Sequence, residues 1–150
     1  QAKRSCGTSH PSMTDRLNWR DARAPSLEDI EQLAAEAWER LPAHFREMCS
    51  DLVIRVEDFA TDEVLNELGI ESPFDLMGLY QGVSLDQRSI SDLPRQPDMI
   101  FLYRRAILDY WTESEDTLGD IVAHVLVHEI GHHFGFSDED MERIEASAKP

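Results

Sequence analysis

Cysteine is scarce in this chain. It has only Cys6 and Cys49, and neither lies in a CxxC pair or near the histidine cluster described below. Two scattered cysteines do not make the disulfide framework that is typical of small secreted proteins. Residues 1–24 also lack the apolar stretch of about 7–15 residues that marks a secretory signal. We therefore expect a cytoplasmic protein.

Long apolar runs and positive charge are also in short supply. The longest apolar runs, such as MIFLY at 99–103, are far below the roughly 18 residues of a membrane span. Fourteen basic residues stand against thirty acidic ones, a net charge of −16. Such a surface repels phosphate backbones and anionic lipid, which excludes nucleic acid and membrane as expected partners. A peptide or protein substrate fits better, and the acidity also serves solubility. The oligomeric state is left open, with a monomer as the simplest expectation.

A chain of 150 residues is typical of one domain, and no internal repeat divides it. We expect a flexible N-terminal tail over residues 1–24, in which Trp19 is the one candidate for docking, and a folded domain over 25–150. Hydrophobic periodicity and turn residues predict the order of elements. They are a helix at 27–41, a second short helix at 42–49, a strand at 51–60, a helix at 61–69, strands at 78–85 and 98–103, and helices at 104–111, 118–134 and 137–148. This order predicts a compact α+β domain with a small mixed sheet.

The stretch VHEIGHHFGFSD at 127–138 carries the chemistry. His128 and His132 are four residues apart on a predicted helix, so their side chains share one face at a Cβ separation of about 5–6 Å. Two imidazoles at this spacing can bind one Zn²⁺ ion. Glu129 lies further round the helix, where a carboxylate can take a proton from a metal-activated water. His-Glu-x-x-His in this arrangement is the zinc-peptidase signature.

A catalytic zinc needs a third protein ligand as well as an open position. Only eighteen residues follow His132, which leaves little room for a ligand from a distant second helix. The alternative is a helix that breaks at a glycine and delivers a ligand six residues after the second histidine. Gly135 and Asp138 occupy these positions, so we predict a zinc site formed by His128, His132 and Asp138, with Glu129 as the catalytic base.

The extended motif His128-Glu129-x-x-His132-x-x-Gly135-x-x-Asp138 in a short acidic domain resembles that of the bacterial minimal zincin-like metallopeptidases. The resemblance covers about Leu27 to Ala146, including GLYQGV at 78–83 and IFLYRRAIL at 100–108. It implies a compact zincin fold and zinc-dependent peptidase activity. Metzincins share the glycine turn but usually end it in histidine and carry a later methionine turn, so their details are not carried over.

Two neutral histidines and one carboxylate would leave a net charge of +1 on the zinc site. Bound water is then less acidified than with three histidines, so Glu129 bears more of the proton transfer. Among the other polar residues, His133 is expected to pack or to support the ligands, and His124 to be structural rather than an extra ligand. Glu142 is the alternative third ligand, and Tyr80 and Tyr103 are candidate oxyanion donors or simply half-buried aromatics.

Two functions are therefore open. The first is a zinc metallopeptidase of the HExxHxxGxxD type. In this function the 78–85 strand either holds an extended substrate by β-addition or is a plain edge strand. The second is a zincin-like module that binds a peptide or protein without cleaving it, because a domain this small has little material for a deep cleft.

Overall fold

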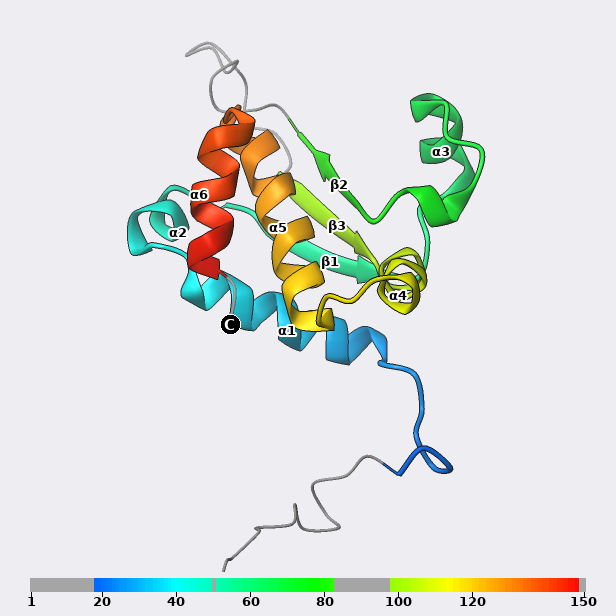
Figure 1. Cartoon of the computed structure of the whole chain (residues 1–150). Coiled ribbons are helices and arrows are strands. Elements are labelled where there is room, and N and C mark those ends of the chain that lie inside the picture. Colours follow the sequence, from blue (N-terminus) through cyan, green and yellow to red (C-terminus); the bar gives the residue numbers. More distant parts are fainter. Residues whose placement is uncertain (1–17, 50, 83–97, 149–150) are drawn as a thin grey trace, which may run out of the picture.

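The computed structural model describes residues 18–49, 51–82 and 98–148. Within them the chain forms an α+β domain, which confirms the predicted fold class (Figure 1). The elements in chain order are α1 (Leu27–Arg40), α2 (Ala43–Met48), β1 (Val53–Glu57), α3 (Asp62–Leu68), the short 3₁₀ helix η1 (Pro73–Asp75), β2 (Gly78–Gln81), β3 (Met99–Tyr103), α4 (Arg104–Glu113), α5 (Leu118–Phe134) and α6 (Asp138–Ala148).

The three strands form one mixed sheet in the order β1-β3-β2. β3 is the central strand; it pairs parallel with β1 and antiparallel with β2. Its alternate residues Ile100 and Leu102 are fully buried, whereas Phe101 is only partly covered. The continuous apolar sequence of β3 thus reflects its central position, where side chains on both faces meet covering elements. Among the described strands β2 lies at the edge of the sheet, and it lies beside α5.

The helix α5, which carries the motif, begins and ends at the predicted residues. The Thr117 side chain caps it by accepting a hydrogen bond from the Asp120 backbone N–H at 3.2 Å. Gly135 ends it in the left-handed conformation, with φ 73° and ψ 32°, which glycine adopts at little steric cost. The turn reverses the chain, so that α6 runs antiparallel beside α5 (Figure 1).

The main core lies between α5, α1 and the sheet. It is built from side chains that are almost fully covered, among them Ile30, Ala34 and Leu41 of α1 or its end, Ile100 and Leu102 of β3, and Val122, Leu126 and Ile130 of α5. A smaller cluster beneath α3 joins Leu65 to Tyr103 and Ala106. Because α5 is covered on most of its surface, only a narrow face of the helix remains for chemistry.

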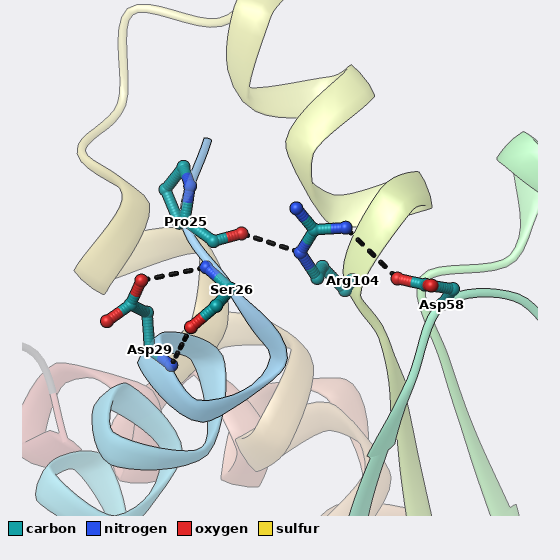
Figure 2. A network of polar contacts seen from close by, with 5 residues as sticks. All are labelled: Pro25, Ser26, Asp29, Asp58 and Arg104. Atoms are coloured by element: carbon teal, nitrogen blue, oxygen red, sulfur yellow. Dashed lines mark hydrogen bonds and ion pairs between the residues drawn. The ribbon is translucent and has the colours of Figure 1, made fainter. Parts of the chain in front are cut away.

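Arg104 links three segments that are distant in sequence (Figure 2). Its Nε donates to the Pro25 carbonyl at 2.5 Å, and one terminal nitrogen lies 3.1 Å from Asp58 Oδ1. Directly after Pro25, Ser26 and Asp29 form a reciprocal capping box that starts α1. Arg104 therefore ties the start of α1 to the segment that follows β1.

Trp19 has 78% of its surface exposed and does not dock on the part of the domain that the structure describes. The predicted strand at 78–85 is observed only over Gly78–Gln81, since 83–97 lie outside the described residues. None of the described helices is long and apolar enough to cross a bilayer.

Candidate metal-dependent active site

The exposed face of α5 is a row of histidines. His124, His128 and His132 follow at intervals of four residues, and all three side chains are exposed, whereas most of the helix is buried. The ring centroids of His128 and His132 are 4.9 Å apart, and those of His124 and His128 are 6.0 Å apart. The fold thus brings the two predicted histidine ligands together on one face of the helix.

Glu129 lies beneath this row and is only 7% exposed. One carboxylate oxygen is 3.3 Å from His132 Nδ1, and the carboxylate also accepts a hydrogen bond from the backbone N–H of Tyr80 in β2. Burial raises the pKa of Glu129, while the nearby His132, His128 and the Tyr80 amide act in the opposite direction. A buried carboxylate with a raised pKa next to polar donors has the properties of a general base.

The strand β2 approaches α5 closely because position 78 has no side chain. A Cβ atom built at Gly78 would lie 2.6 Å from Val125 Cγ1 and 3.2 Å from Glu129 Cγ. Tyr103 N–H donates to Met77 O at 2.9 Å. The alternation of an antiparallel ladder therefore turns the peptide groups of Gly78 and Tyr80 away from β3. The Tyr80 amide reaches Glu129, and the Gly78 peptide group lies beside it, on the edge of the sheet that no described strand pairs with.

A cavity of about 250 Å³ lies in the angle between this edge and α5. It is lined by Leu76, Met77, Gly78, Val125, His128 and Glu129, together with His124. A second cavity, of about 270 Å³, continues along α5 from His124 and Met77 toward Asp116 and Asp120. The glutamate and one of the two predicted histidine ligands thus border a groove that runs beside an edge strand.

Asp138, the predicted third ligand, is the first residue of α6 and is exposed. Just before it, Ser137 caps the helix by accepting the Asp140 backbone N–H at 3.3 Å. In the part of the chain that the structure describes, no group of three or more His, Cys, Asp or Glu side chains is arranged to hold a metal ion. The two clustered imidazoles therefore suit zinc, but the Asp138 carboxylate does not lie with them as a third ligand.

His133 points away from the histidine row and is 3% exposed. Its Nδ1 lies 3.1 Å from an oxygen of Asp98, the equally buried residue just before β3. This pair ties the last turn of α5 to the sheet and so supports the position of His132. The supporting role of His133 was a sequence-based expectation; Asp98 as its partner was missed, because no local pattern links a residue before a strand to a helix 35 positions later.

The two tyrosines considered as oxyanion donors do not turn their hydroxyls into the groove. Tyr103 is 2% exposed, and its pKa is raised to about 12, chiefly by burial and further by Glu57 and Glu129. The Tyr80 hydroxyl is buried near Gly82, on the side of Asp98 and His133. Both residues therefore fit the alternative expectation, that of aromatic side chains with a packing role.

The fold and this site together define an α+β domain with a His-Glu-x-x-His helix beneath an edge strand. Residues 49–148 match the family model described as zincin-like metallopeptidase. The chain belongs to the zincin-like metallopeptidase family, since the match covers two thirds of it. Membership implies metal-dependent peptidase activity with zinc as the metal and peptides as the substrate class. No curated protein matches the chain.

Proposed function

We propose that this chain is a zinc-dependent peptidase in which His128, His132 and Asp138 bind the metal and Glu129 is the catalytic base. The observation that carries the proposal is the buried Glu129 carboxylate, held between His132 and the Tyr80 amide at the edge of the groove. Zinc bound to such a site would polarise the scissile carbonyl and lower the pKa of water.

The residues of the chain perform the remaining work. Glu129 takes the proton of the attacking water and then returns it to the leaving amine, which is the sequence of steps that peptide hydrolysis requires. The raised pKa of Glu129 favours that uptake. His132 Nδ1 faces Glu129, so its Nε2 is the nitrogen available to a metal, and the partner at Nδ1 orients the ring.

The substrate in this proposal is an extended peptide beside β2. The outward peptide group of Gly78 can pair with one residue of such a peptide by β-addition. The Tyr80 amide already donates to Glu129, so β2 offers few backbone hydrogen bonds to a substrate. The specificity for the substrate must therefore come largely from the cavities. A cytoplasmic location is part of the proposal, because the chain has only two cysteines and Cys49 is a free thiol.

The test compares wild type with Glu129→Gln on a library of peptides after zinc loading. Loss of the base is expected to lower kcat by about 10²–10⁴-fold, while the zinc content measured by mass spectrometry stays unchanged. The matched control is Glu63→Gln, which makes the same carboxylate-to-carboxamide change at an exposed position on α3. Cleavage by Glu129→Gln at the wild-type rate would reject this assignment.

The third ligand is tested separately by zinc titration. Asp138→Asn is expected to weaken zinc binding, whereas Glu139→Gln beside it is the control of equal charge change. Unchanged affinity in Asp138→Asn, together with loss in Glu142→Gln, would transfer the role to Glu142.

A second candidate, a zincin-like module that binds peptides without cleaving them, is favoured by one observation. The described residues do not assemble three metal ligands. Retention of an intact peptide by wild type, with no cleavage at full zinc loading, would select this function.

A further inference from the structure

The two cavities along α5 meet at His124. The first borders Glu129 and His128; the second is surrounded by Tyr110, Asp116, Asp120 and Glu145. Met77 and His124 line both cavities. These two side chains, one from the segment before β2 and one from α5, therefore stand at the boundary between the two halves of the groove.

The His124 ring is held in place from α6. Its Nδ1 lies 2.7 Å from an oxygen of Glu145, whose side chain is 15% exposed. On its other side, the ring stacks on His128 at an interplanar angle of 24°. Half of the His124 side chain nevertheless remains exposed, because it stands in the groove and is not packed into the core. A ring with contacts on two sides forms a fixed wall.

Beyond the wall the chemistry of the groove changes. The cavity next to Glu129 has Leu76, Met77 and Val125 in its lining, so it suits a small apolar side chain. The second cavity has the carboxylates of Asp116, Asp120 and Glu145 in its lining. A long side chain that passed His124 would meet these carboxylates, and a cationic end would be favoured there.

From this arrangement we infer that His124, held by Glu145, is a specificity-determining residue that restricts the cleaved peptides to those with a short apolar side chain beside the scissile bond. The inference rests on the proposed peptidase function and deepens it. It also assigns to His124 a role other than metal binding. Without the ring, the two cavities become one, and long basic side chains gain entry.

The experiment measures cleavage of an equimolar peptide library by zinc-loaded wild type, His124→Ala and Glu145→Ala, with Glu63→Ala as control. Wild type is expected to cut beside short apolar residues. In His124→Ala, kcat/KM for lysine or arginine at that position should rise at least tenfold relative to the short residues. Glu145→Ala should show a smaller rise in the same direction, because it frees the ring without removing it. An unchanged profile in His124→Ala overturns the inference, as does loss of bound zinc in that variant.

A binding measurement separates this inference from the proposed function. Fluorescence anisotropy with a short-residue peptide and a lysine peptide is carried out in the Glu129→Gln background, with and without His124→Ala. A shift in preference toward the lysine peptide supports the wall even if no peptide is cleaved. Cleavage with unchanged preference keeps the peptidase and rejects the wall, and absence of binding to either peptide rejects the wall as well.

Discussion

The contact between β2 and α5 can be tested by adding one methyl group at Gly78. This contact places the edge strand beside Glu129, and Gly78 is buried within it. In Gly78→Ala, the new Cβ would lie 2.6 Å from Val125 Cγ1, and 3.2 Å from both Glu129 Cγ and the Phe101 carbonyl oxygen. Nothing nearby can relieve the clash cheaply, because Val125 is β-branched and Phe101 contributes backbone. The strand or the helix must therefore move.

Overpacking of this kind typically costs about 1–3 kcal/mol. For a domain of this size, each kcal/mol corresponds to a fall of about 2–4 °C in Tm. Displacement of β2 also lengthens the hydrogen bond from the Tyr80 amide to Glu129. We expect Gly78→Ala to lose stability in urea unfolding and to lower kcat, while zinc affinity changes little, because His128 and His132 both lie on α5.

A double-mutant cycle with Val125→Ala identifies the cause. Removing the Val125 methyl groups opens the space that the new Cβ needs, so the two losses should be less than additive. Gly69→Ala is the contrasting variant: its Cβ meets nothing within 4 Å, but Gly69 has φ +68°. It should lose about 1–2 kcal/mol through backbone strain, with no rescue by Val125→Ala. Additive losses in the Gly78–Val125 cycle would refute the steric argument.

Three further predictions concern the rest of the body. Burial raises the pKa of Cys49 to about 12. Alkylation of Cys49 at pH 8, followed by peptide mass spectrometry, should therefore be slow until urea unfolds the chain. Because the folded pKa exceeds the unfolded one, the stability due to the protonated thiol is complete below the unfolded pKa of about 8.5 and is lost as pH rises toward 12. Gly131→Ala places a Cβ against the side chain of Met141, which is flexible, and gains about 1 kcal/mol of helix propensity. Thermal unfolding should therefore show a smaller loss of stability than for Gly78→Ala. An equal loss of stability would mean that α6 cannot adjust. Arg104→Met should cost about 1.5–3 kcal/mol in urea unfolding, since a charged donor that is mostly buried is lost, whereas Asp58→Asn, at a half-exposed site, should cost less than about 1 kcal/mol.

Much of the fold could be predicted because its signals are local. Thr117 and Gly135 bound α5 by their side-chain oxygen and backbone freedom, properties that act within one helical turn. Similarly, the continuous apolar run at 99–103 predicted a strand covered on both faces, and it is the central strand of the sheet. The spacing of His128 and His132 placed both rings on one face, since helical geometry alone determines that relation.

The contacts that join segments distant in sequence could not be predicted in this way. The Tyr80 amide on Glu129, the Asp98 partner of His133 and the Glu145 partner of His124 all link different elements. The assignment of Asp138 as third ligand remains a prediction, because it depends on how α6 lies against α5 and not on spacing alone.

The sequence by itself determined the helix, its caps and the chemical groups along it: two imidazoles and a carboxylate at helical spacing. Only the tertiary structure decided which of these groups is buried, which edge strand lies beside them and what lines the groove. Periodicity specifies a direction around one helix axis, whereas burial, pKa shifts and substrate access depend on the neighbours that the folded chain brings to that helix.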